Sequence, residues 1–108
     1  MVEGGLYRVV LTPEFEEDLL RAAMYVSNEL ASPIAARNLV QGIQDALDRK
    51  RAMPTAAPTY VSLAGEMRYV ATYKRWGAYY VVEGDSIKVL GLKHQLQDSR
   101  AGALPGEE

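Results

Sequence analysis

The chain has 108 residues, 48% of them hydrophobic, which suits one small domain with a single apolar core. With no cysteine and one histidine, disulfides, thiolate metal sites and the usual histidine-rich zinc sites are excluded, so we expect no metal and no cofactor. The formal net charge of −2 argues against a strong nonspecific nucleic-acid binder, which usually carries a basic excess.

The apolar runs of the chain are short. The run at residues 78–82 falls far below the roughly 20 residues that span a bilayer. Residues 1–11 lack the basic start and apolar stretch of a secretion signal. Together with the absence of cysteine, this predicts a cytoplasmic protein with no membrane partner.

Charge is distributed unevenly along the sequence. Four acids fall within residues 14–18, whereas six bases accompany three acids between residues 68 and 100. We therefore expect any basic surface to belong to the C-terminal third. The acidic run is typical of a solvated helix start, where the helix dipole favours anions.

The first elements are a strand and a helix. Residues 6–11 are rich in β-branched and aromatic residues, which predicts a short strand that ends at Thr12 and Pro13. Thr12 can cap a helix whose first position is Pro13, and the helix should run to about Leu30. Its apolar stripe consists of Phe15, Leu19, Ala22, Val26 and Leu30. The side chains expected to turn outward are Asp18, Arg21 and Asn28.

A second helix follows almost at once. Ser32 and Pro33 repeat the start signal of the first helix, so the two helices should form an antiparallel hairpin. The bases at residues 49–51 should lie in its last turn, as a solvated helix end or, alternatively, a phosphate-contacting cluster. The predicted buried stripe is Ala36, Leu39, Val40, Ile43, Ala46 and Leu47.

The C-terminal part of the chain has strand-like patterns. Residues 67–73, 78–82 and 87–92 are separated by hairpin-sized connections, which predicts a three-stranded antiparallel meander. The fold class is therefore α+β, with the helical hairpin packed on one face of a small sheet whose other face stays partly open. We expect one domain over residues 1–98 and a flexible tail over residues 99–108.

The order and spacing of these landmarks resemble the RelE/ParE toxin family of bacterial type II toxin–antitoxin systems. The matching segments are residues 7–14, 33–36 and 53–54, Arg68, and residues 80–85, 87–94 and 97–98. The resemblance implies the same α+β fold and a cytosolic toxin that stalls growth. It also implies a cognate antitoxin that masks the toxin surface, contact with DNA only through that antitoxin, and a dimer or a hetero-oligomer.

The family divides between ribosome-dependent mRNA cleavage and inhibition of DNA gyrase, and the residues leave both open. Metal-free RNA cleavage needs a general base, a general acid and cations on the phosphate. The resemblance implies that a ribonuclease would use Arg68, Arg75 and His94. However, Gly77 stands where the ribonuclease branch commonly has an arginine, so the sequence favours the gyrase-directed branch, which is not thought to cleave anything itself.

His94 has two interpretations. An imidazole with a reference pKa of about 6.5 is the best general acid or base available, and at a strand end it could reach a substrate on the open face. A single histidine followed by Gln95 and Asp98 is also typical of a contact or structural residue at the end of a strand.

The aromatic residues of the meander and a basic hairpin tip complete the candidate surfaces. By alternation, Tyr69 and Tyr73 share one face while Tyr79 and Tyr80 point oppositely, which favours packing over base stacking. The exposed tip around residues 74–76 is a candidate partner contact. The predicted partner-binding residues are Lys74, Arg75, Trp76, Lys93 and His94.

Three hypotheses therefore remain. The first is a ParE-like toxin that inhibits gyrase by binding and is neutralised by an antitoxin. The second is a ribosome-dependent endoribonuclease. The third is a degenerate, non-toxic member that acts in a repressor complex.

Overall fold

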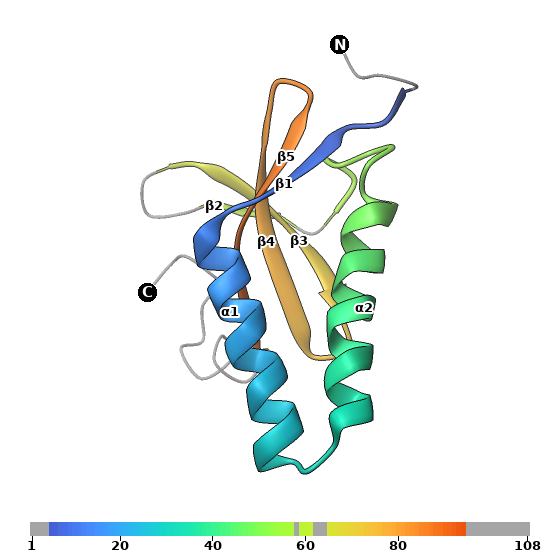
Figure 1. The fold of residues 1–108 in the computed structure, drawn as a ribbon. Coiled ribbons are helices and arrows are strands. Elements are labelled where there is room, and N and C mark those ends of the chain that lie inside the picture. The colour runs from blue at the N-terminus through green and yellow to red at the C-terminus, as the bar shows by residue number, and fades with distance from the viewer. Residues whose placement is uncertain (1–4, 58, 62–64, 95–108) are drawn as a thin grey trace.

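The chain forms a mixed helix and strand structure (Figure 1). It is a computed structural model that describes residues 5–57, 59–61 and 65–94. The elements in chain order are β1 (Arg8–Leu11), α1 (Pro13–Met24), the π-helix η2 (Tyr25–Glu29), α2 (Pro33–Arg49), β2 (Thr59–Val61), β3 (Met67–Tyr73), β4 (Trp76–Glu83) and β5 (Ser86–His94). The predicted α+β class is confirmed. The expected tail at residues 99–108 lies outside the described residues.

The sheet has five strands in the order β1-β5-β4-β3-β2. The meander of β3, β4 and β5 is antiparallel, as predicted, and Gly84 has a φ of 59° in the turn before β5. β1 adds to the outer side of β5 in parallel, with Arg8 opposite Ser86. The sequence did not predict β2, a three-residue strand that pairs with the start of β3.

The two helices begin where the capping residues predicted. The Thr12 hydroxyl accepts a hydrogen bond from the Phe15 N–H, and the Ser32 hydroxyl accepts one from the Ala35 N–H, both at 3.2 Å. The prediction of one regular helix to Leu30 is wrong, because α1 ends at Met24 and a π-helical turn follows. That turn changes the helical phase, which leaves Leu30 57% exposed instead of buried.

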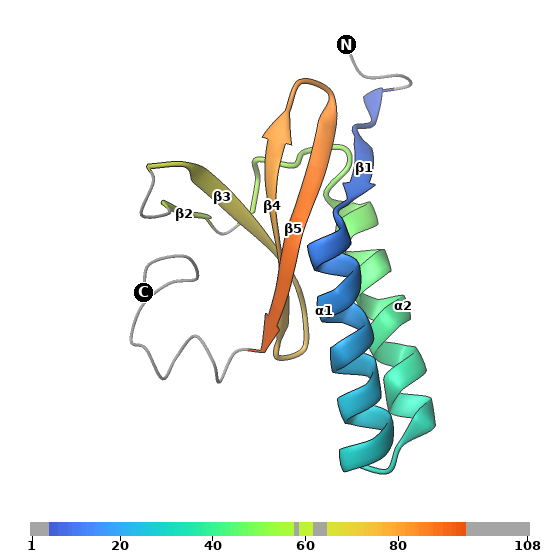
Figure 2. The ribbon, with the colours of Figure 1, turned by 60° about the vertical axis from the view of Figure 1, so that its left-hand side comes forward.

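Both helices lie on the same side of the sheet (Figure 2). Of the predicted α2 stripe, Ala36, Leu39, Ile43, Ala46 and Leu47 pack into the core, whereas Val40 is only half-buried. Phe15 from α1 and Val26 from η2 join them. The sheet supplies Ala78, Tyr80 and other side chains of the same face. The alternation argument is confirmed, since Tyr69, Tyr73 and Tyr80 join this core, whereas Tyr79 does not.

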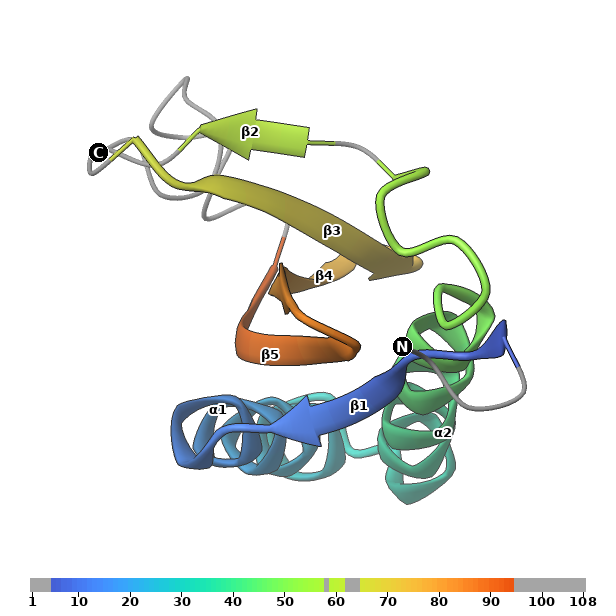
Figure 3. The same ribbon diagram turned by 90° about the horizontal axis from the view of Figure 1, so that it is seen from above.

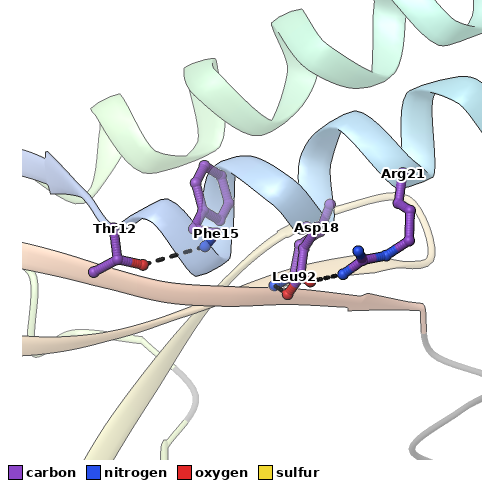
Figure 4. Close-up of polar contacts among 5 residues, drawn as sticks. All are labelled: Thr12, Phe15, Asp18, Arg21 and Leu92. Atoms are coloured by element: carbon purple, nitrogen blue, oxygen red, sulfur yellow. Dashed lines mark hydrogen bonds and ion pairs between the residues drawn. The ribbon is translucent and has the colours of Figure 1, made fainter.

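Two side chains, Thr12 before α1 and Asp18 within it, bond to the backbone of β5, and Figure 4 draws the bond between Asp18 and Leu92. The Thr12 hydroxyl donates to the carbonyl of Val89 at 2.6 Å, and Asp18 Oδ2 accepts from the N–H of Leu92 at 3.1 Å. The prediction that Asp18 turns outward is therefore wrong. The carboxylate satisfies a backbone donor of β5 beyond the reach of β1, whose pairing ends at Leu11 and Val89.

Two further contacts join the layers and the loop. In α2, Gly42 lies against the ring of Tyr73, and a Cβ atom at position 42 would overlap that ring. The buried Tyr80 hydroxyl donates to the carbonyl of Pro54 at 2.6 Å, which fastens the loop after α2 to β4. Residues 49–51 do not all lie in the last helical turn, because α2 ends at Arg49 and the Arg51 Nε donates to the carbonyl of Tyr7 at 2.8 Å.

Seen from above, the sheet curves away from the helices through β4 and β3 to β2 (Figure 3). The face opposite the helices is only partly open. At its centre Tyr79 and Val81 are 4% and 5% exposed, while Arg68, Val70, Lys88 and Lys93 around them are partly exposed. We call the side chains of this face the open face.

Candidate functional site

The predicted partner-binding residues gather at one end of the β3–β4–β5 ladder. Tyr73 pairs with Trp76, so Lys74 and Arg75 form a two-residue turn, in which Lys74 has a φ of 53°. Both turn side chains are exposed, and the Lys74 Nζ lies 5.6 Å from the centroid of the Tyr73 ring. A positive φ at a non-glycine residue is uncommon, so the turn presents two cations on a constrained backbone.

The end of β5 lies beside this turn. Trp76 pairs with His94, and their rings meet edge to face with centroids 4.8 Å apart. Gly77 pairs with Lys93 on the neighbouring rung of the ladder. The structure thus brings Lys74, Arg75, Trp76, Lys93 and His94 together, and we call this group the strand-end cluster.

The members of the strand-end cluster face different sides of the sheet. Trp76 packs against the core, and residues directly opposite in an antiparallel ladder point to the same face, so His94 lies on the helix side. Lys93 points to the open face, where its Nζ lies 6.0 Å from the centroid of the Tyr79 ring. The expectation that His94 reaches the open face is therefore wrong.

Arg68, the third residue of the ribonuclease hypothesis, is distant from the strand-end cluster. It precedes Tyr73 on β3 by five residues, or about 16 Å at roughly 3.3 Å per residue. Alternation places it on the open face, where its guanidinium forms an ion pair with Glu66 at 3.0 Å. Arg68 and His94 thus occupy opposite faces, which leaves no shared substrate position between them.

The side chains of Val70 and Tyr79 occupy the space beside the Cα atom of Gly77. A Cβ atom there would lie 3.0 Å from Val70 Cγ1 and 3.5 Å from the Tyr79 ring. A longer side chain would have to displace Val70. The absence of an arginine at this position therefore agrees with the packing of the open face.

A bulge in β5 determines where two lysines point. Tyr79 pairs with Gly91 and Tyr80 with Val89, so Leu90 is an extra residue in the ladder. Lys88 and Lys93 are five residues apart, which in a regular strand would put them on opposite faces. Because of the bulge, Lys88 pairs with Val81 and both lysines belong to the open face. Sequence analysis missed Lys88 as a candidate, since alternation carries no signal for a bulge.

Two groups outside the strand-end cluster have perturbed pKa values. Burial raises the pKa of Tyr80 to about 12, and the neighbouring Tyr69 adds to the rise. At the β4–β5 turn, burial opposes ionisation of Asp85, but the charge and hydrogen bond of Arg8 outweigh it and lower its pKa. Both groups hold elements together and neither belongs to the strand-end cluster.

Among the described residues, no three His, Cys, Asp or Glu side chains are grouped so that they could hold a metal ion. Neither of the helices traced in residues 13–49 has the length and apolar character to cross a bilayer.

Comparison with known proteins identifies the family. A family model described as the ParE toxin of the type II toxin-antitoxin system, parDE, matches residues 9–99. The chain belongs to this ParE toxin family. The predicted family is therefore confirmed, and the ParE family name describes a toxin component whose system includes an antitoxin.

A solved structure has the same fold. The chain is similar to one in the chromosomal ParDE TA system from P. aeruginosa, with a TM-score of 0.69 and 18% sequence identity. The similarity covers 84% of this chain and 98% of that chain, and it shows a common fold. No curated protein matches the sequence.

Proposed function

We propose that this ParE-family chain inhibits DNA gyrase in the cytoplasm by surface contact and is neutralised by a cognate antitoxin. The observation that carries the proposal is the division of the candidate catalytic residues. Arg68 and His94 lie on opposite faces of the sheet. The strand-end cluster, in contrast, presents cations and an aromatic ring together at one end of β3, β4 and β5. That arrangement suits binding better than acid–base chemistry on one phosphate.

The composition of the strand-end cluster supports a role in protein contact. Arginine and tryptophan are enriched among residues that dominate interface energies, because they combine a large apolar area with a polar group. Lys74 and Arg75 are exposed at the turn, and Lys93 extends the positive charge onto the open face. Such a surface favours a partner with an acidic patch, and charge complementarity would accelerate its association.

A supercoiling reaction tests the proposal. Purified chain should inhibit DNA gyrase, and the double substitution Lys74→Glu/Arg75→Glu should raise the concentration needed for half inhibition at least tenfold. The matched control is Arg37→Glu/Arg49→Glu, which reverses two exposed bases on α2 and should inhibit like the unchanged chain. Full supercoiling activity at saturating chain, or equal inhibition by both double variants, would contradict the proposal.

A translation reaction separates the two targets. The proposal predicts intact mRNA on ribosomes at chain concentrations that stop supercoiling. Cleavage of mRNA that His94→Ala abolishes would establish the endoribonuclease instead, with Arg68 and Arg75 as the next residues to test. No effect in either reaction and no growth arrest on expression would indicate a non-toxic member that acts only in a repressor complex.

A further inference from the structure

The open face has an apolar centre that lies outside the main core. Tyr79 and Val81 occupy this centre and are almost fully buried, although neither belongs to the core between the helices and the sheet. Both helices lie on the other side of the sheet (Figure 2), and in the described part of the chain no helix crosses the open face. The Lys93 side chain reaches over the Tyr79 ring, which accounts for part of this burial. The rest indicates that a further segment packs on the open face.

Two lysines flank the apolar centre on β5. Lys88 pairs with Val81, and Lys93 belongs to a rung four residues away along β4, or about 13 Å at roughly 3.3 Å per residue. Neither lysine takes part in an ion pair among the described residues. Glu83 lies two residues beyond Val81 on the same face and limits the positive area at that end. The open face therefore offers an apolar strip bordered by two available cations.

The sequence that follows β5 suits this surface. β5 ends at His94, next to Lys93, so residues 95–108 start at the border of the open face. Ten residues of extended chain reach about 33 Å, which exceeds the roughly 13 Å between the two lysine rungs. The charged residues of the segment are Asp98, Arg100, Glu107 and Glu108, for a net charge of −2, and its leucines are Leu96 and Leu104. Its charge and its apolar content both complement the open face.

We propose that residues 95–108, where sequence analysis predicts a flexible tail, fold back onto the open face of the same molecule. The leucines of the segment cover Tyr79 and Val81, and the carboxylates of Glu107 and Glu108 lie against the two lysines. The tether selects this occupant, because a linked segment has an effective concentration of the order of millimolar.

The docked segment masks part of the cationic surface of its own chain. An acidic partner that uses the two lysines must first displace residues 95–108, so the segment competes with such a partner. The inference does not depend on the gyrase target, since it concerns a contact within one molecule. Its test likewise needs no partner protein.

A spin label locates the segment in the full chain. The sequence has no cysteine, so Gly106→Cys accepts a nitroxide at one position only. Amide signals of residues 79–81 and 88–90 should broaden at least threefold more than those of residues 73–76. A segment that swings freely from His94 would broaden residues 73–76 most, because that turn lies beside the end of β5. That pattern, or no broadening on the sheet, would overturn the inference.

Charge variants of the labelled chain test what holds the segment. Glu107→Lys/Glu108→Lys should reduce the broadening of residues 79–81 about threefold or more, and so should Lys88→Glu/Lys93→Glu. The four substitutions together should restore the broadening, because the opposite charges face each other again. Both lysines are partly exposed, and circular dichroism should report an unchanged fold. Unchanged broadening in both double variants, or no recovery in the combination, would overturn the inference.

A matched control and salt check that the effect is electrostatic and local. Glu16→Lys/Glu17→Lys reverses two exposed acids on α1 and should leave the broadening unchanged. Salt at 1 M, where the Debye length is about 3 Å, should reduce the broadening as the Glu107→Lys/Glu108→Lys variant does. Equal loss of broadening in the α1 control would mean that net charge, not this contact, governs the segment.

A mixed sample separates one molecule from two. Spin-labelled chain without nitrogen-15 is mixed with nitrogen-15 chain that carries no label. The proposal predicts sharp signals for residues 79–81 and 88–90 in this mixture. Broadening there would make the occupant residues 95–108 of a second copy and would overturn the contact within one molecule.

Discussion

The helical hairpin and the sheet have opposite charge. Residues 13–49 contain seven acids and three bases, for a net charge of −4, whereas residues 67–94 contain five bases and two acids, for +3. A chain with a net charge of −2 thus contains two surfaces that attract different partners. The net charge of a chain therefore says little about its partners when its two layers carry charges of opposite sign.

The inward surfaces of the two layers, by contrast, are fitted to each other. The hairpin and the sheet meet through apolar side chains, the contact of Gly42 with the ring of Tyr73, and the carboxylate of Asp18. Substitutions at this junction should therefore reduce stability, while those on the outward surfaces should change binding alone. Three junction substitutions test this division.

The largest effect is expected at Gly42. Gly42→Val places side-chain atoms where the Tyr73 ring packs, so one layer must shift, and the free energy of unfolding should fall by about 3 kcal/mol. Gln41→Val is the matched control, since it introduces the same side chain at the neighbouring, exposed position of α2 and should lose less than about 1 kcal/mol. Urea denaturation of the two variants measures the difference. Equal losses of unfolding free energy would show that the contact between Gly42 and Tyr73 does not hold the layers together.

Asp18→Ala should have the next largest effect. It leaves the Leu92 N–H without its acceptor in a partly buried position, which should cost about 2 kcal/mol. Asp18→Asn keeps an acceptor oxygen and should lose less, and Glu17→Ala is the exposed control. Amide hydrogen exchange at Leu92 should accelerate in Asp18→Ala more than in Glu17→Ala. Unchanged exchange would mean that α1 does not depend on this bond.

Tyr80→Phe should have the smallest effect at neutral pH, about 1 kcal/mol, because it removes the hydrogen bond to the Pro54 carbonyl. Its signature is the pH dependence. The folded-state pKa of Tyr80 is raised to about 12, above the unfolded value of about 10, so its contribution is complete below pH 10 and is lost as the pH rises toward 12. Tyr80→Phe should remove that alkaline loss, whereas Tyr25→Phe, at an exposed tyrosine, should retain it.

The local features of the fold were predictable from the sequence. Thr12 and Ser32 cap the helices where their residue types and the following prolines indicated, and the buried stripe of α2 follows the helical period. Hairpin turns at residues 74–75 and 84–85 likewise follow local signals. Each of these features depends on residues within a few positions of one another.

The missed features depend on distant partners. Nothing near Asp18 reveals the Leu92 N–H that it accepts, and nothing near Gly42 reveals the ring of Tyr73. β2 has three residues, too few to show an alternating pattern. The faces of Lys88 and His94 could not be assigned because they depend on ladder register and on the bulge at Leu90. The strand-end cluster was predictable as a group of residues, but not the side of the sheet that each one faces.

The parallel pairing of β1 with β5 has a consequence for synthesis of the protein. Arg8 and Asp85 are 77 residues apart in sequence. β1 therefore cannot pair with β5 until almost the whole chain has been synthesised. Pairing across such a separation slows folding, and a nascent chain on the ribosome keeps the apolar sides of its helices uncovered meanwhile. A polypeptide interrupted before residue 86 therefore lacks the strand that joins β1 to β4, and with it Lys93 and His94 of the strand-end cluster.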